Sequence, residues 1–384
     1  MIDHLLPLER FGIVVFVVLI AGLLLTYLRQ PRVAGYLVVG MFLGPHVFGL
    51  SPPHEMTEFL SEMGVVFLLF FVGMEVSVQR LIQGWRISVI GTLGQVLLSV
   101  GFVWLMGLWH GWNLGEIVLI GFIISLSSTA VVLTVLQNWN ELNTTGGQDV
   151  LGILLVQDLM VVPMLIILGL LGGESPTAFS VGLEMVGGLL ICGLIGYVVL
   201  KGKVTIPTPK VIEDDDELEV FLSLAICLGL AILTTVFGLS EALGAFAAGI
   251  FVSAAGWTDR HHRILHPFKV VFMALFFVSI GMLVNLPYVL EHWGKISILV
   301  LLIFIVNTVI NALILRAGKR TLKDSWYGGF LLSQIGEFSF VLASVGMASG
   351  IWSEGREQVA YATIAMSLIL SPLWIGMGKA LLKR

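Results

Sequence analysis

Charged residues are scarce in this sequence. Only 12% of its 384 residues are Asp, Glu, Lys or Arg, whereas 57% are hydrophobic. This composition excludes an ordinary soluble domain and is typical of a protein that crosses a membrane many times. We therefore expect the lipid bilayer to surround most of the chain.

Several chemical motifs are also missing. The sequence has no CxxC or HExxH motif, no phosphate-binding glycine loop and no basic patch of the kind that binds nucleic acid. Its two cysteines, Cys192 and Cys227, both lie in apolar runs and read as small core residues, not as a disulfide or metal pair. No nucleophile–base constellation appears. We therefore expect no enzymatic activity, no cofactor and no nucleic-acid partner.

The long apolar runs predict 13 transmembrane helices. Short polar segments such as SPPHE (51–55) and IPTPK (206–210) fit the loops between them. The predicted spans are 11–28, 33–50, 61–80, 86–109, 115–136, 147–172, 181–201, 218–237, 240–255, 267–286, 294–316, 326–349 and 357–382. The fold class is therefore an all-α polytopic membrane protein.

The basic residues predict the orientation of these spans. Alternate loops and the C-terminus, all on one side, hold 17 of the 20 Lys and Arg residues. The other side holds Arg10, Lys295 and Arg356. Because basic loops remain in the cytoplasm, we expect the N-terminus outside and the C-terminus inside, in a cell membrane of the bacterial inner-membrane kind.

One acid lies deep inside an apolar run. Gln157 and Asp158 are adjacent within Leu151–Pro163, and Asp158 falls about 11 residues into its span, roughly 16 Å along the helix. That depth is close to the midplane of a hydrocarbon core about 30 Å thick. A carboxylate there is costly unless it is hydrated, paired or protonated, so it marks an ion or proton path, the alternative being a structural acid paired within the bundle.

The chain also repeats itself at one offset. GYLVVGMFLG (35–44) aligns with GAFAAGIFVS (244–253), and SLSSTAVVL (125–133) aligns with QIGEFSFVL (334–342), both 209 residues apart. This offset equals seven spans, so equivalent helices would run in opposite directions. We infer one transport domain over residues 1–384, with inverted six-helix repeats at about 11–172 and 218–382 joined by a helix at about 181–201.

The fifth span of each repeat is interrupted by polar or flexible residues. Corresponding broken helices in two halves indicate the midplane site of a transporter, since broken backbone offers carbonyls to a cation and helix ends to a carboxylate. The alternative is that the hydroxyls only bond within their own helix or join neighbouring helices. The residues concerned are Ser125, Ser127, Ser128 and Thr129 in one repeat and Ser333, Gln334, Gly336 and Glu337 in the other.

Several segments carry a family resemblance. LLVQDLMVVP, SLSSTAVVL, SEALGAFAAGIFVS, HPFKVVFMALFFVSIGM and SQIGEFSFVLASVG resemble the membrane domain of Kef-type potassium/proton antiporters, which belong to the second monovalent cation:proton antiporter group. The resemblance covers nearly the whole chain. It implies the sodium/proton-antiporter fold, with crossed discontinuous helices in a core domain, a dimerisation domain and a homodimer.

The resemblance also implies roles for individual residues. Asp158 would exchange a proton for a monovalent cation, and Gln157, Ser127, Ser128 and Thr129 would help to form the ion site. The crossed helices would be supported by Ser125, Gln334, Glu337 and Asn307. Glu337 has two alternative roles, to carry protons or to neutralise the broken helix ends. Asn307 either supports the crossed helices or, together with Asn311, makes ordinary hydrogen bonds between helices.

Two features depart from the family pattern. Kef-type relatives often carry a lysine nine residues before the basic residue that ends the helix equivalent to 294–316. Counting back nine from Arg316 gives Asn307, so a lysine–aspartate ion pair is not expected here. The family usually also has a cytoplasmic nucleotide-binding domain after the last span, whereas this sequence stops at Arg384. We expect a missing regulatory domain or subunit, or regulation of another kind.

These observations predict electroneutral exchange of K⁺ for H⁺ by alternating access. Na⁺ is the close alternative, because the size of a cavity and its carbonyl field are not visible in a sequence. Other readings are a cation channel without proton coupling, a symporter of organic anions on the same fold, and a membrane subunit without transport activity. No predicted span has a Lys or Arg at its centre to face an organic anion.

Overall fold

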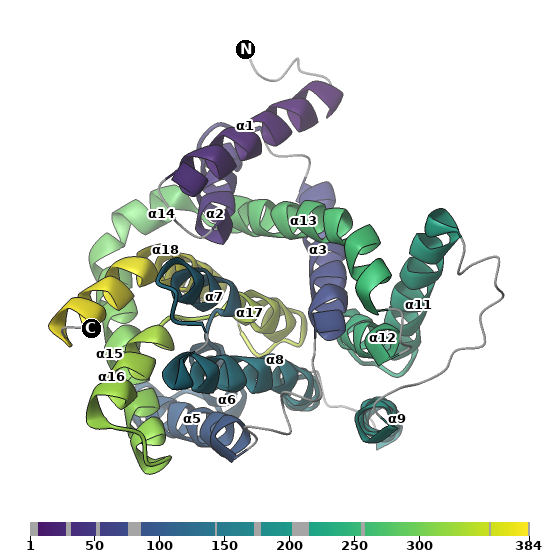
Figure 1. Ribbon diagram of the computed structural model, residues 1–384. Coiled ribbons are helices and arrows are strands. Elements are labelled where there is room, and N and C mark those ends of the chain that lie inside the picture. Colours follow the sequence, from purple (N-terminus) through teal and green to yellow (C-terminus); the bar gives the residue numbers. More distant parts are fainter. Residues whose placement is uncertain are drawn as a thin grey trace. The chain divides into compact units, whose positions relative to one another are not determined.

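The computed structural model describes residues 7–27, 32–50, 54–75, 86–142, 144–172, 178–201, 215–254, 258–352 and 355–382. All regular secondary structure in these ranges is helical (Figure 1). Within these described ranges, seven helices are long and apolar enough to cross a membrane, and six shorter apolar helices accompany them. Each of these segments overlaps a different one of the 13 predicted spans, so the all-helical multi-pass architecture is confirmed.

The helices follow the predicted order along the chain. Their bounds are α1 Pro7–Tyr27, α2 Arg32–Leu43, α3 His54–Glu75, η1 Arg86–Ile90, α5 Gly91–His110, α6 Leu114–Ser125, α7 Thr129–Asn138, α8 Thr145–Leu171, α9 Ala178–Lys201, α11 Asp216–Val236, α12 Glu241–Ala254, α13 Thr258–Leu283, α14 Leu286–Glu291, α15 Trp293–Ala317, α16 Leu322–Leu331, α17 Phe338–Ala348 and α18 Arg356–Leu381.

Three boundaries differ from the prediction by seven residues or more. The third span was expected to begin at residue 61, but α3 begins at His54. The second span was expected to run to residue 50, but α2 ends at Leu43, since Pro45 follows and disfavours a helical residue before it. The tenth span was expected to begin at Pro267, but α13 begins nine residues earlier, at Thr258, and continues through that proline. A proline inside a membrane helix is tolerated where neighbouring groups satisfy the freed carbonyl.

The chain forms two compact units. The first comprises Met1–Thr57, Arg80–Val161 and Phe277–Arg384, and the second comprises Glu58–Gln79 and Val162–Phe276. In the second unit α12 packs against α11 and α9, and side chains of α3, α11 and α12, including Phe70, Cys227 and Ala248, form its core. In the first unit α15 packs against α5, α16 and α18, and α17 packs against α6 and α18. The first unit contains the predicted site.

Both helices that were predicted to be interrupted are broken. The first break covers residues 126–128, between α6 and α7, and the second covers residues 332–337, between α16 and α17. At the first break Ser128 is extended and its hydroxyl caps α7 by accepting from the Val131 N–H at 3.2 Å. The Ser125 hydroxyl bonds back to the Phe122 carbonyl at 2.9 Å. A helix end inside a membrane needs such partners, because no water reaches its free backbone groups.

Two close helix contacts recur at the offset of the sequence repeat. In the first unit a Cβ atom on Gly40 of α2 would lie 2.7 Å from the Cα atom of Gly281 of α13. In the second unit a Cβ atom on Gly249 of α12 would lie 2.9 Å from the Cα atom of Gly73 of α3. Positions 40 and 249 differ by 209, and positions 73 and 281 by 208. This recurrence is what the repeat leads one to expect, and the inverted repeat itself stays a prediction.

Candidate ion site at the crossing of two broken helices

Asp158 lies at the centre of its helix. It is 13 residues after Thr145 and 13 before Leu171, the two ends of α8, and only 6% of its surface is exposed. At about 1.5 Å per residue it is roughly 20 Å from either end. The Thr129 hydroxyl donates to the carboxylate, at 3.1 Å from Oδ2 and 3.3 Å from Oδ1.

One hydrogen-bond partner of Asp158 lies directly after the first break. Thr129 is the first residue of α7, directly after the capping Ser128. The N-terminus of a helix carries a partial positive charge, which favours an anion nearby. A donated hydroxyl proton also favours the charged form of the carboxylate, whereas burial penalises it. The break therefore supplies stabilisation that offsets part of the cost of an ionised acid at this depth.

Gln157 faces the backbone of the same break. Its Oε1 atom accepts from the Ser127 N–H at 3.0 Å, and its Nε2 atom donates to the Ser125 carbonyl at 3.3 Å. Nε2 also donates to Oε1 of Gln95, on α5, at 2.6 Å. The Gln157 side chain is fully buried. Its amide therefore holds the shape of the break next to Asp158.

The two breaks contact each other directly. The Gly336 N–H donates to the Leu126 carbonyl at 2.8 Å, and the Ser127 hydroxyl donates to the Leu332 carbonyl at 2.9 Å. A Cβ atom on Gly336 would lie 2.5 Å from the Ser127 carbonyl oxygen. Gln334 reaches the Ser128 carbonyl with Nε2 at 3.5 Å. The crossing is therefore a close contact of two backbones, which only glycine permits at position 336.

Two asparagines on α15 bind both breaks. Asn307 Nδ2 donates to the Ile124 carbonyl at 2.8 Å and to the Ser333 carbonyl at 3.2 Å. Asn311 Nδ2 donates to the Leu332 carbonyl at 3.3 Å and to the Asn307 carbonyl at 2.9 Å. Both side chains are fully buried. These neutral donors satisfy carbonyls near the ends of the interrupted helices, and Asn307 occupies the position where the family resemblance would place a lysine.

The structure thus brings most of the predicted residues together. Thr129 hydrogen-bonds to Asp158, and Gln157 hydrogen-bonds to the backbone of Ser125 and Ser127. Asn307 and Gln334 donate to carbonyls of the second and the first break. Glu337 is buried directly before the first residue of α17, with 6% of its surface exposed. Among the described residues, no group of three or more His, Cys, Asp or Glu side chains comes together that could hold a metal ion.

Gln95 was missed by the sequence analysis. A signal for it was present, because Thr92, Gln95 and Ser99 are polar residues three and four apart in an otherwise apolar span, and all three are fully buried in α5. That spacing places them on one helix face. Only the structure shows that this face meets α8, where the Thr92 hydroxyl donates to the Ile153 carbonyl at 3.3 Å.

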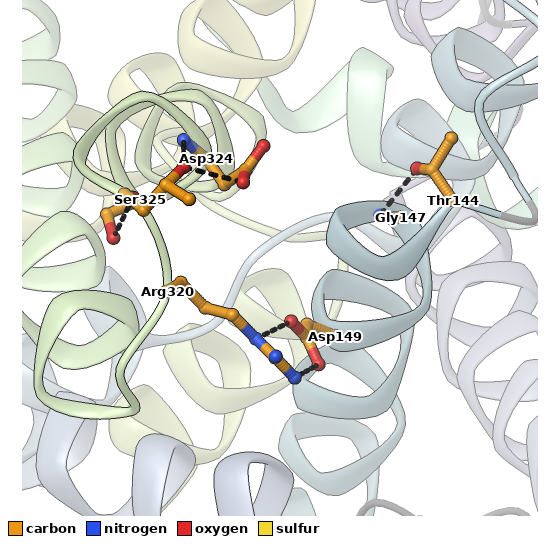
Figure 2. A network of polar contacts seen from close by, with 7 residues as sticks. Thr144, Gly147, Asp149, Arg320, Asp324 and Ser325 are labelled. Atoms are coloured by element: carbon orange, nitrogen blue, oxygen red, sulfur yellow. Dashed lines mark hydrogen bonds and ion pairs between the residues drawn. The ribbon is translucent and has the colours of Figure 1, made fainter.

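Ion pairs join helix ends around the site. Arg320, before α16, makes a bidentate pair with Asp149 near the start of α8, with N–O distances of 2.5 and 2.8 Å (Figure 2). The hydrogen bond with Asp149 raises the pKa of Arg320 above its ordinary value. In the same view Thr144 accepts from the Gly147 N–H at 3.1 Å and so caps α8. The pair fixes the start of the second broken helix to the helix that carries Asp158.

Other ion pairs agree with the predicted alternation of the spans. Glu141 binds the Tyr327 hydroxyl and Lys379, the latter at 3.0 Å, and Lys379 lies 3.9 Å from the centre of the Trp139 ring. The span count places these residues on one side of the membrane. Glu116, at the start of α6, pairs with Arg356, at the start of α18. The span count places both on the opposite side.

The chain is similar to known membrane transporters over almost its whole length. The family model described as sodium/hydrogen exchanger, transmembrane, matches residues 13–377. The iron transporter MagA of Paramagnetospirillum magneticum is 33% identical over 372 residues, which cover 97% of this chain and 86% of MagA. K(+) efflux antiporter 5 of Arabidopsis thaliana is 31% identical over 379 residues, covering 97% of this chain and 66% of that protein.

The chain is also similar to a protein of Escherichia coli and to a solved structure. The glutathione-regulated potassium-efflux system protein KefC of Escherichia coli is 30% identical over 350 residues, covering 89% of this chain and 55% of KefC. The chain therefore spans just over half of KefC. The sodium proton antiporter MjNhaP1 of Methanocaldococcus jannaschii has the same fold, with a TM-score of 0.71, 19% identity, and coverage of 98% of this chain and 99% of MjNhaP1. This multi-pass membrane protein belongs to the transmembrane sodium/hydrogen exchanger family of cation/proton antiporters, and it is a membrane domain of the Kef type.

Proposed function

We propose that this protein exchanges a monovalent cation for a proton, and that the cation is K⁺. Asp158 is the binding site that the cation and the proton share. The observation that carries this proposal is the position of Asp158 at the centre of α8, buried and bonded to Thr129 at the first break. An ionisable group at that depth marks an ion or proton path. The family and the fold are those of cation/proton antiporters.

Exchange follows from competition for one carboxylate. The ionised Asp158 group binds a dehydrated cation beside the Thr129 hydroxyl, and the protonated group is neutral. Both occupied forms carry no net charge at the site, whereas the bare carboxylate is costly to move through a medium of low dielectric constant. The site therefore changes sides only when it is occupied, which couples the two ion fluxes and prevents a leak.

The remaining predicted residues act by holding the breaks. Gln157 uses both ends of its amide on the break, and the Ser127 and Ser128 groups bond to backbone or cap α7. We assign these three a positioning role, with Ser125, Gln334 and Asn307 as supports of the crossing. Glu337 is assigned to neutralising the start of α17. Asp158 and Thr129 are the groups assigned to direct contact with the ion.

The charge balance supports electroneutral exchange. Asn307, at the position of the family lysine, is neutral and donates to the Ile124 carbonyl near the end of α6 and to the Ser333 carbonyl of the second break. Because Asp158 is the one acid assigned to the ion and Asn307 adds no charge, one proton replaces one cation and no net charge crosses the membrane.

The names of the relatives support K⁺ as the cation. K(+) efflux antiporter 5 and KefC are named for potassium, whereas the family description and MjNhaP1 name sodium, which is the alternative. MagA is named an iron transporter. Carboxylate and hydroxyl oxygens suit hard cations, whereas iron sites in proteins commonly use His or Cys. The groups assigned to the ion, Asp158 and Thr129, are of the first kind.

Assembly and location are proposed from the resemblance. We place the protein as a homodimer in a bacterial inner membrane, with the N-terminus outside and the C-terminus in the cytoplasm. We also propose a regulatory domain or subunit as a partner of the membrane domain. KefC and K(+) efflux antiporter 5 support this proposal because the match covers only 55% and 66% of their lengths.

The test is cation-driven proton movement in proteoliposomes that hold a pH-sensitive dye. Adding K⁺ outside should acidify the medium or make the lumen alkaline in proportion to the protein present, and Asp158→Asn should abolish the response. Asp215→Asn is the matched control, because Asp215 is an exposed cap of α11 and asparagine caps equally well. A channel would give ion current without a pH change, and coupled exchange by Asp158→Asn would refute the proposal.

A further inference from the structure

Gln95 is a fully buried polar residue of α5 that makes one short contact. Its Oε1 atom accepts from Gln157 Nε2 at 2.6 Å. Its own Nε2 atom has no hydrogen-bond partner among the described residues. Only the acceptor half of this side chain is therefore in use.

The direction of this bond is set by the backbone. The Ser127 N–H can only donate, so the atom of Gln157 that faces it must be Oε1. Gln157 Nε2 must then point the other way, toward the Ser125 carbonyl and Gln95. Gln95 in turn must offer its oxygen. Although the two amide atoms look alike, the orientation of both amides follows from one fixed donor.

The chain of hydrogen bonds continues into the second broken helix. The Ser127 N–H and the Leu126 carbonyl belong to the same peptide unit. The N–H end is held by Gln157, and the carbonyl end is held by the Gly336 N–H at 2.8 Å. The chain thus runs from Gln95 through Gln157 and this peptide to Gly336, and it fixes the peptide plane from both ends.

We propose that Gln95 is a positioning residue of the ion site. By accepting from Gln157 it fixes the peptide between Leu126 and Ser127, two residues before Thr129 contacts Asp158. The expected effect of Gln95 on transport rests on the proposed function. Its expected effect on the orientation of the peptide between Leu126 and Ser127 does not.

The arrangement argues against a purely stabilising role. A buried amide donor without a partner costs free energy that an apolar side chain would avoid. A methionine at position 95 would fill a similar volume without that cost, but it would give Gln157 Nε2 no acceptor. Nε2 would then keep only the Ser125 carbonyl, at 3.3 Å.

The first test measures exchange in proteoliposomes against cation concentration. Gln95→Met should raise the half-saturating K⁺ concentration about fivefold, the loss expected for one buried hydrogen bond. Gln95→Glu, which keeps an acceptor oxygen at the same reach, should stay within about twofold of the wild type. Ser99→Ala is the control, since its hydroxyl lies one turn further along the same buried face and has no hydrogen-bond partner among the described residues.

The second test does not depend on transport. Hydrogen–deuterium exchange of peptides that contain residues 125–129, in purified full-length protein, should be faster in Gln95→Met than in the wild type and unchanged in Ser99→Ala. If Gln95→Met does not fold, Gln95→Asn replaces it, because the shorter side chain loses the same acceptor. Unchanged protection in the Met or Asn variant, or an equal effect of Ser99→Ala, would overturn the proposal. A wild-type protein that exchanges neither K⁺ nor Na⁺ for protons would refute the proposed function, and this second test would still decide the proposal for Gln95.

Discussion

Replacing Gly336 with alanine should separate the two broken helices. The added Cβ atom would lie 2.5 Å from the Ser127 carbonyl oxygen, 2.7 Å from the Ser127 carbonyl carbon and 3.2 Å from the Ser128 nitrogen. All three are backbone atoms, so no side chain can rotate out of the way. Ordinary contact requires the breaks to move apart by roughly 0.5–1 Å. The hydrogen bond from Gly336 to Leu126, now 2.8 Å, would then be lost or greatly weakened.

The size of the effect follows from these two terms. Overpacking of a close contact costs about 1–3 kcal/mol, and a lost buried hydrogen bond adds about 1 kcal/mol. We therefore expect Gly336→Ala to lower the free energy of unfolding by about 2–4 kcal/mol, which is a large part of the stability of a typical domain. Exchange should fall with it, because Thr129 and Asp158 depend on the position of the first break.

The assay is denaturant unfolding of the purified protein in detergent, together with exchange in proteoliposomes. Gly376→Ala is the matched control, since a Cβ atom there meets nothing within 4 Å and the residue lies inside α18. The control should unfold like the wild type or be slightly more stable, because alanine favours a helix over glycine. Wild-type stability and transport in Gly336→Ala would refute the close crossing.

Two further outcomes are expected. Arg320→Gln should lower the free energy of unfolding by at most about 1 kcal/mol, because the pair with Asp149 is partly exposed. The pKa of Arg320 is raised, so the ion pair contributes fully to the free energy of unfolding below the ordinary arginine pKa and is lost only as the pH rises through the raised value. Unfolding curves between about pH 7 and 10 should therefore show a constant difference between the variant and the wild type. A difference that vanishes in this range would contradict the ion pair. The rate of exchange by the wild type should not depend on an imposed membrane potential. Dye measurements with and without a diffusion potential that does not involve K⁺ would check this. A steep dependence on the potential would contradict one-for-one exchange.

The breaks could be predicted from residue types alone. Serines, glycine and glutamine interrupt two apolar runs at matching places, and such residues favour caps and turns over helix interiors. The central acid was equally visible, because Asp158 has apolar neighbours for a full helical turn on both sides apart from Gln157. The all-helical fold followed from the length of the apolar runs. Prolines at positions 45 and 267 account for two displaced boundaries, whereas the early start of α3 at His54 was not expected.

The partners of these residues could not be predicted. Gln157 was expected at the ion, whereas the structure shows which backbone groups its amide binds, and that depends on contacts between segments 30 and 62 residues apart. Asn307 was expected to support the crossed helices, but the carbonyl that it binds, that of Ile124, lies 183 residues away along the chain. A pattern along one helix identifies the face that a residue occupies, but not the helix that covers that face. This is why the contact of Gln95 with Gln157 could not be predicted, although Thr92 and Ser99 mark the same polar face of α5.

The central claim is that a cation and a proton compete for Asp158. It is tested most directly by adding K⁺ to purified protein in a weakly buffered detergent solution and measuring the protons released. The account predicts release of up to about one proton per chain, saturable in K⁺ and largest where the acid is protonated beforehand, and no release from Asp158→Asn. Release that is equal in the variant, or none from the wild type at any pH where it transports, would contradict the claim.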